Sequence, residues 1–145
     1  GRASGTTYRY RVRAFNAGGQ SGYSDPATAT TPTTSQSHVG NLNGTTTSTK
    51  NNWQASVTVT AHDASHAALI GAVVTGAWSG GFSATASCTT NSAGQCTVQS
   101  GNINRNRPSV TLTVTNVASA LAYSAAGNHD PDGSSNGTAI TVNKP

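Results

Sequence analysis

Four oxygen-bearing side chains near the end of the chain alternate as the ligands of a calcium loop do. Asp130, Asp132, Ser134 and Asn136 occupy every second position of a segment rich in turn-forming residues. EF-hand-like loops present oxygens to Ca²⁺ at this spacing. Here a glycine falls at the fourth position rather than the sixth, and no glutamate closes the loop. The sequence therefore predicts either a Ca²⁺ site at these four residues or a plain turn, because Pro-Asp-Gly is itself a turn signal.

The two cysteines of the chain, Cys88 and Cys96, flank a turn signal at residues 91–94. We predict that they form a structural disulfide, because a hairpin with this turn would bring them opposite one another and within bonding reach. The chain has no further cysteine and no CxxC motif, which argues against a metal or redox role. Disulfides persist in oxidising compartments, so the pair predicts an extracellular, secreted protein.

His62 and His66 have the spacing of the two histidines in the HExxH motif of zinc proteases. That motif requires a helix and a glutamate base, whereas this chain has no glutamate and the flanking residues alternate as strands do. We interpret residues 62–66 as a polar turn between strands. His38 and His129 are interpreted as surface or capping residues near the Asp130 segment.

Catalytic patterns are scarce elsewhere in the chain. It has four aspartates, no glutamate and no Gly-x-Ser-x-Gly nucleophile motif. Asp130 and Asp132 share one turn, so they would not flank a cleft as the carboxylate pair of a glycosidase does. We expect a protein that is not an enzyme.

Hydrophobic periodicity predicts an all-β fold. Residues 55–60 and 110–115 alternate apolar with hydroxyl side chains, and residues 138–142 are predicted to form the closing strand. Turn-forming residues separate such runs at near-regular spacing. Repeated short strands of this kind are typical of a β-sandwich. Residues 41–44 are predicted to form an edge segment and residues 45–52 a polar loop. We expect the few large apolar side chains to supply most of the core: Leu69, Ile70, Trp53, Trp78, Phe82, Leu112 and Val114.

The first 32 residues have a different pattern. Tyr8, Tyr10, Val12 and Ala14 alternate with three arginines, and residues 16–19 form a turn signal. Residues 5–32 resemble the last two strands of a fibronectin type III domain. This resemblance implies the tyrosine-corner position for Tyr8 and inward positions for Val12 and Ala14. Because the other five strands of such a domain are missing, these four side chains are predicted to form an assembly hairpin that packs on a partner.

A second resemblance covers most of the remaining chain. The runs at 57–63, 70–74 and 89–98 resemble the immunoglobulin-like modules of secreted and surface proteins of bacteria. The whole region 38–145 resembles the C-terminal accessory domains of secreted bacterial proteins, including subtilisin-like proteases. The predicted organisation is thus a partial fibronectin type III hairpin at 1–32, a linker at 33–37 and an immunoglobulin-like β-sandwich at 38–145.

These observations predict a non-catalytic extracellular structural or assembly module, whose hairpin pairs with a neighbouring subunit to build a filament. The partner would be another copy of the chain or the parent polypeptide. The alternative is an accessory domain of a larger secreted hydrolase. It would bind its substrate, a carbohydrate or a cell surface through surface aromatic side chains such as Tyr23, Trp53, Trp78 or Tyr123. The net charge of +4 is concentrated in the hairpin arginines, which argues against a nucleic-acid face, and no apolar run is long enough for a membrane span.

Overall fold

The computed structural model describes residues 5–31 and 35–145. The chain divides into two compact units, up to Thr34 and from Ser35 onward. Residues 33 and 34 of the expected linker lie outside the described residues, and its last two residues belong to the first strand of the second unit. No helix in the described ranges is long and apolar enough to cross a membrane.

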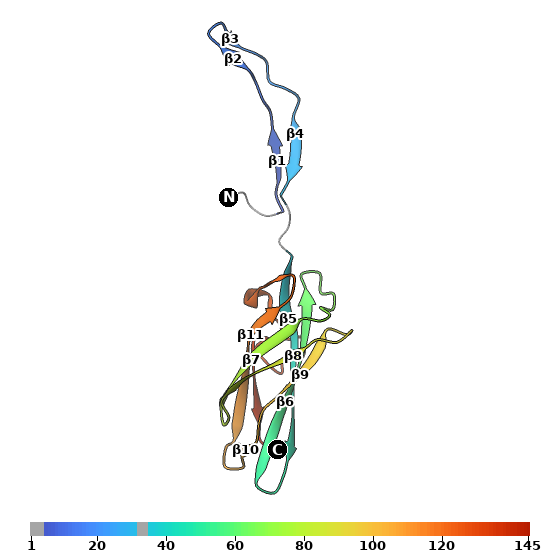
Figure 1. Cartoon of the computed structure of the whole chain (residues 1–145), viewed down its shortest axis with the longest axis vertical. Helices are drawn as coiled ribbons and strands as arrows, with labels where there is room; N and C mark the ends of the chain where they lie inside the picture. The colour runs from blue at the N-terminus through green and yellow to red at the C-terminus, as the bar shows by residue number, and fades with distance from the viewer. Residues whose placement is uncertain (1–4, 32–34) are drawn as a thin grey trace. The chain divides into compact units, whose positions relative to one another are not determined.

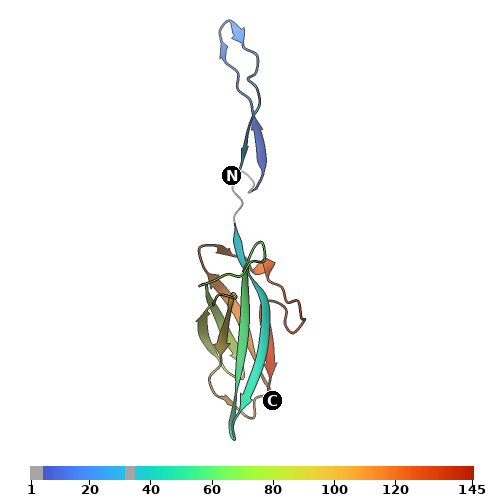
Figure 2. The same ribbon diagram turned by 90° about the vertical axis from the view of Figure 1, so that its right-hand side faces the viewer.

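The second unit is a sandwich of two sheets, coloured teal to red in Figure 1 and turned by 90° in Figure 2. The five-stranded sheet has the order β10-β6-β5-β12, and β9 also pairs with β6. The four-stranded sheet has the order β13-β11-β7-β8. A single turn of 3₁₀ helix, η1 (Ala125–Gly127), follows β12. The strand bounds are β5 Gln36–Ser48, β6 Asn52–Asp63, β7 Val73–Gly80, β8 Ala84–Thr89, β9 Gln95–Gln99, β10 Ile103–Asn104, β11 Ser109–Ala118, β12 Ala122–Tyr123 and β13 Ala139–Asn143.

The core lies between the two sheets and follows the alternation of the strands. In β6 the apolar residues from Trp53 to Ala61 are buried at every second position, and β11 buries Val110, Leu112 and Val114 in the same way. Both tryptophans belong to this core, with Trp53 1% and Trp78 3% exposed. Because the period of a strand is two, alternate residues on each sheet fill one shared layer.

Two details differ from the sequence-based expectations. Ile70, expected in the core, is 66% exposed, because it lies in the turn before β7 rather than on a strand. Residues 45–48, expected in a polar loop, continue β5 and pair with β6 as far as Ser48 opposite Trp53. Threonine is a good strand former, and a solvent-facing strand accepts its hydroxyl without cost.

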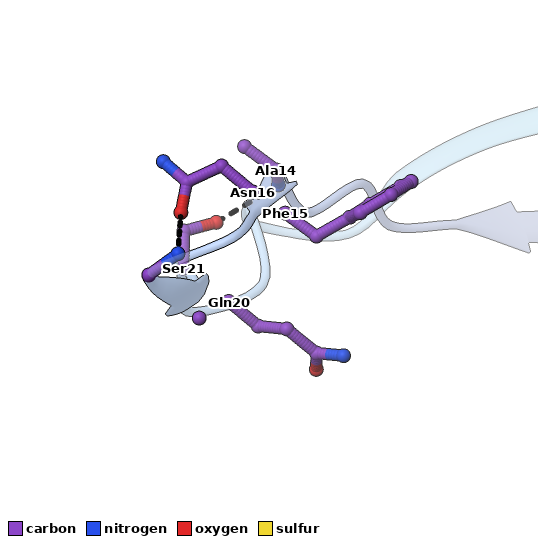
Figure 3. Close-up of a pocket in the computed structure, with 7 residues that line it drawn as sticks. Ala14, Phe15, Asn16, Gln20 and Ser21 are labelled. Atoms are coloured by element: carbon purple, nitrogen blue, oxygen red, sulfur yellow. Dashed lines mark hydrogen bonds between the residues drawn. The ribbon is translucent and has the colours of Figure 1, made fainter.

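The first unit is a long hairpin whose two arms pair in two short ladders. Near its base, β1 (Thr7–Tyr10) pairs with β4 (Ala27–Thr30), and at its tip β2 (Phe15–Asn16) pairs with β3 (Gly19–Gln20). The ladder is interrupted between β1 and β2, where the hydroxyls of Ser21 and Ser24 accept hydrogen bonds from the backbone N–H groups of Ala14 and Val12. Figure 3 shows the tip of the hairpin, where the Phe15 side chain extends away from Asn16 and Gln20.

The predicted disulfide between Cys88 and Cys96 is present, but its setting differs from the expected hairpin. Cys88 lies on β8 of the four-stranded sheet and Cys96 on β9 of the five-stranded sheet. The turn between them therefore carries the chain from one sheet to the other. The Cα atoms are 5.7 Å apart, within the usual range for a disulfide. The bond is thus a covalent tie across the sandwich.

We predict that replacing both cysteines by serine lowers the free energy of unfolding by about 2.5 kcal/mol, the loop-closure value for a short loop. Urea titration followed by tryptophan fluorescence measures this difference, since Trp53 and Trp78 are both core residues. A reductant should lower the stability of the native chain to the same level and leave the variant unchanged. An equal response of both proteins to the reductant would contradict the prediction.

Candidate metal centre

All four histidines of the chain come together where β5 begins and β6 ends. One ring nitrogen of each of His38, His62, His66 and His129 lies within 4.8 Å of the corresponding nitrogens of the others. Their ring centroids are 5.0 to 6.1 Å apart. His38 is 6% exposed, so its interpretation as a surface residue is wrong, and it forms one cluster with His62, His66 and His129.

Strand pairing places the first two histidines. His38 on β5 is the direct cross-strand partner of His62 on β6, so the two side chains share the sheet face that points away from the core. The register then shifts at Gly40, which forms a β-bulge. A methyl group at Gly40 would overlap the His62 ring, so the glycine leaves the space that this imidazole fills.

A tight turn brings His66 back toward His62. The Oδ1 atom of Asp63 accepts hydrogen bonds from the Ser65 N–H (2.8 Å), the Ser65 hydroxyl (2.7 Å) and the Ala67 N–H (3.0 Å). His66 itself has a φ of 63°, the only positive φ outside glycine among the described residues. This left-handed conformation is uncommon for a residue with a side chain, although histidine adopts it more readily than most. The expected polar turn is thus present, and it positions the third imidazole of the cluster, that of His66.

The segment after η1 supplies the fourth histidine. The His129 N–H donates to the Val39 carbonyl (3.0 Å), and the Val39 N–H donates to the Asn128 side-chain oxygen (2.8 Å). The Asn128 amide also donates to the Tyr123 hydroxyl (2.7 Å) and the Thr138 hydroxyl (2.9 Å). Residues 128 and 129 are therefore held against β5 by a connected hydrogen-bond network, which places His129 beside His38.

The solvent exposure of the four histidines differs from one residue to the next. His38 is 6% exposed, His62 and His129 are half-buried, and His66 is exposed. Burial is the main cause that lowers the pKa of His38 and of His62, and the neighbouring imidazoles lower both values further. The carboxylate of Asp63 opposes these effects at both rings. Burial and mutual repulsion thus favour the neutral imidazole, which is the form that ligates metals.

Two ring nitrogens in the cluster are buried without a hydrogen-bond partner: Nε2 of His38 and Nδ1 of His62. At His129, Nδ1 lies 3.3 Å from the Gly127 carbonyl oxygen. A proton on that nitrogen would donate to the carbonyl and leave the lone pair on Nε2. Neutral imidazoles with free lone pairs suit Zn²⁺, Cu²⁺ and Ni²⁺ rather than Ca²⁺, which prefers oxygen ligands.

The predicted Ca²⁺ residues lie nearby in sequence but make hydrogen bonds of their own. Asp132 accepts bonds from the Asn41 amide (2.9 Å) and the Ser134 N–H (3.0 Å), and Asp130 accepts one from the Ser135 N–H. The Ser134 hydroxyl donates to the Leu42 carbonyl (2.9 Å), and Asn136 accepts bonds from the N–H groups of the two residues that follow Gly137. Hydrogen bonds within the segment order its turns, and the bonds to Asn41 and Leu42 hold it against β5. Ca²⁺ binding at these residues stays a prediction.

The aromatic side chains considered for substrate binding are mostly unavailable. Trp53 and Trp78 are core residues, and Tyr123 is half-buried with its hydroxyl bonded to Asn128. Tyr23 is 55% exposed, and the guanidinium groups of Arg11 and Arg13 lie 4.9 and 5.0 Å from the centre of its ring. Substrate or carbohydrate binding through these residues stays a prediction.

Comparison of the chain with protein-family models, with curated proteins and with solved structures finds no match in any of the three. What the histidine cluster can do is therefore argued from its own geometry.

We predict that Asp132 makes stability sensitive to acid. The hydrogen bond from Asn41, followed by those from Ser134, lowers the pKa of Asp132 to about 2. A depressed carboxyl pKa stabilises the fold above the unfolded-state pKa of about 4, and this contribution is lost as the pH falls toward 2. Because Asp132 is solvent-exposed, the effect should be small.

Thermal unfolding between pH 5 and pH 2 tests this prediction. The Asp132→Asn variant should lose less stability than the native chain over this range. Asp25→Asn in the hairpin unit serves as the control and should leave the pH dependence of sandwich unfolding unchanged. Identical acid profiles for Asp132→Asn and the native chain would contradict the assigned role.

Proposed function

We propose that this chain is a non-catalytic extracellular structural module that assembles through its N-terminal hairpin. The observation that carries the proposal is the exposure of large side chains in a unit whose described residues form ladders only two strands wide. Tyr10 is 46%, Val12 72% and Phe15 82% exposed. An isolated two-stranded hairpin is marginal in water. Such a unit gains stability by packing its apolar side chains on another sheet, and this is the expected use of the hairpin.

The arrangement of side chains on the hairpin favours one face for this contact. Tyr8, Tyr10, Val12 and Ala14 alternate with the arginines, and the cross-strand partners of Tyr8 and Tyr10 are the small residues Ala29 and Ala27. Because directly paired residues share a face, this side of the hairpin is flat and apolar. The opposite face carries the arginines, two of which lie against Tyr23. The apolar face is the assembly surface in this proposal.

A second copy of the chain is the proposed occupant, with the parent polypeptide as the other source of a matching sheet. A head-to-tail contact between different surfaces of identical chains propagates into filaments unless it closes into a ring. The disulfide across the sandwich supports the extracellular setting, because such bonds persist in oxidising compartments. A covalently tied sandwich is also a suitable repeating unit for an assembly outside the cell.

We predict that the full chain self-associates in a concentration-dependent manner, whereas a fragment of residues 35–145 stays monomeric. The fragment retains the complete buried core of the sandwich. Sedimentation velocity over a wide concentration range measures the mass distribution, and negative-stain microscopy distinguishes filaments from rings. A full chain that stays monomeric at the highest concentration would refute assembly through the hairpin.

A pair of matched variants assigns the surface. Tyr10→Asp introduces a charge on the apolar face and should weaken association at least tenfold. Thr28→Asp introduces the same charge on the opposite face, since Thr28 is the cross-strand partner of Arg9, and association should be retained. Equal loss of association in both variants would show that the apolar face has no special role.

A further inference from the structure

We propose that His38, His62, His66 and His129 bind one divalent transition-metal ion, and that Zn²⁺ is the ion. This inference stands apart from assembly through the hairpin, because every ligand belongs to the sandwich unit. The four residues are also all of the histidines that the 145-residue chain contains. Four separate segments each contribute one imidazole to a single point, and no described histidine lies elsewhere.

The distances are close to those that a bound ion requires. A Zn–N bond is about 2.0–2.1 Å, so the nitrogens of a tetrahedral site lie about 3.3 Å apart. The four ring nitrogens already lie within 4.8 Å of one another. Small rotations of the imidazole rings would close this difference. Tetrahedral coordination by four nitrogens is a geometry that Zn²⁺ adopts readily, since its filled d shell imposes no preference of its own.

The buried state of His38 gives independent support for a ligand. Its side chain is more than nine-tenths buried, and its Nε2 atom has no hydrogen-bond partner. A buried polar atom without a partner is costly and rare, and an ion is one of the few things that resolves it. The Nδ1 atom of His62 is also buried without a partner among the described residues, and it faces the Gly40 backbone. Without an ion, this arrangement would gather four imidazoles and leave the Nε2 atom of His38 unsatisfied.

The local structure positions three of the four ligands. Gly40 leaves space for the His62 ring, Asp63 orders the turn that carries His66, and Val39 fixes the segment that carries His129. The positive φ of His66 is a further local cost. Asp63 acts here as a positioning residue, because its hydrogen bonds go to the turn. The oxygen from Gly127 at His129 Nδ1 corresponds to the outer-shell contact that metal-bound histidines commonly make.

Four protein ligands leave no coordination position for water or substrate, so the site is structural. Bound Zn²⁺ would join the start of β5, the end of β6, the following turn and the segment after η1. These are the places where the five-stranded sheet lacks long neighbouring strands, since β12 pairs with only two residues of β5. The ion would therefore fasten the open end of the sheet.

Titration of the tag-free, metal-stripped full chain tests the proposal directly. Isothermal titration calorimetry with ZnCl₂ should give one site per chain, and Ca²⁺ should not compete. Co²⁺ should bind with the intense visible absorption of a tetrahedral ion. The absence of Zn²⁺ binding, or a stoichiometry different from one, would overturn the site. An octahedral Co²⁺ spectrum, or selective Cu²⁺ binding without Zn²⁺ binding, would overturn the closed zinc geometry.

The His66→Asn variant removes the most exposed ligand and keeps a residue that tolerates positive φ. Loss of an outer-shell contact costs 10–100-fold in metal affinity, so loss of a ligand should weaken Zn²⁺ binding more than about 100-fold. His129→Gln should act in the same way, and it keeps the proposal testable if His66→Asn folds poorly. Ser124→Ala is the matched control, because Ser124 lines a surface pocket together with His38 and His66 and is not a ligand. Native-like binding in both histidine variants would overturn the proposal.

Stability gives a second readout that does not depend on calorimetry. An ion that binds only the folded state, at 100 times its dissociation constant, should raise the unfolding midpoint of the sandwich by about 10 °C. EDTA should reverse the shift, and the His66→Asn variant should not show it. Carbethoxylation of the histidines should likewise be slowed by Zn²⁺ in the native chain. A Zn²⁺-induced shift of equal size in His66→Asn would place the ion elsewhere.

Discussion

The pairing of β5 with β6 is the interaction on which the rest of the sandwich unit depends. Val39 and Leu42 are both fully buried, although they are three residues apart and a regular strand would turn them to opposite faces. The bulge at Gly40 inserts the extra residue, so Val39 pairs with Ala61 and Leu42 with Val59, which share the core face. The same register places His38 opposite His62 on the outer face. One backbone irregularity thus serves the core and the histidine cluster together.

Much of the sandwich could be predicted because alternation survives in its central strands. The runs around Val57 and Leu112 show a clean period of two, and the structure pairs them as strands in the two sheets. β5 was harder to recognise, because its asparagines, glycines and threonines resemble a polar loop and the bulge breaks its alternation. The disulfide was predictable from two cysteines and a turn. Its position between sheets was not, because a turn sequence does not reveal whether the chain re-enters the same sheet.

The histidine cluster could not be predicted for a related reason. Only His62 and His66 are close in sequence, and their spacing matched a helical zinc motif that the strand pattern excludes. The link to His38 requires the β5–β6 register. The link to His129 requires the hydrogen bond that Val39 donates to Asn128 and the one that it accepts from His129. No spacing in the sequence signals the whole cluster, because His38, the pair His62 and His66, and His129 are far apart along the chain. The Asp130 segment is a motif that is visible in the sequence. Some of its oxygens accept hydrogen bonds within their own turn, whereas Oδ1 of Asp130 has no partner among the described residues, and Ca²⁺ binding there stays a prediction.

The disulfide and the proposed ion are cross-links in different parts of the sandwich, and both add stability to a core of small side chains. The buried cluster consists mainly of valine and alanine, which bury less apolar area than larger side chains do. The disulfide ties the two sheets together where β8 and β9 meet. The histidines lie on the opposite, outer face of the five-stranded sheet, at the start of β5 and the end of β6. The buried Nε2 atom of His38, which has no partner among the described residues, costs stability, and coordination of an ion would offset that cost. A sheet end that gathers four imidazoles at this cost is most simply understood as one that closes around an ion.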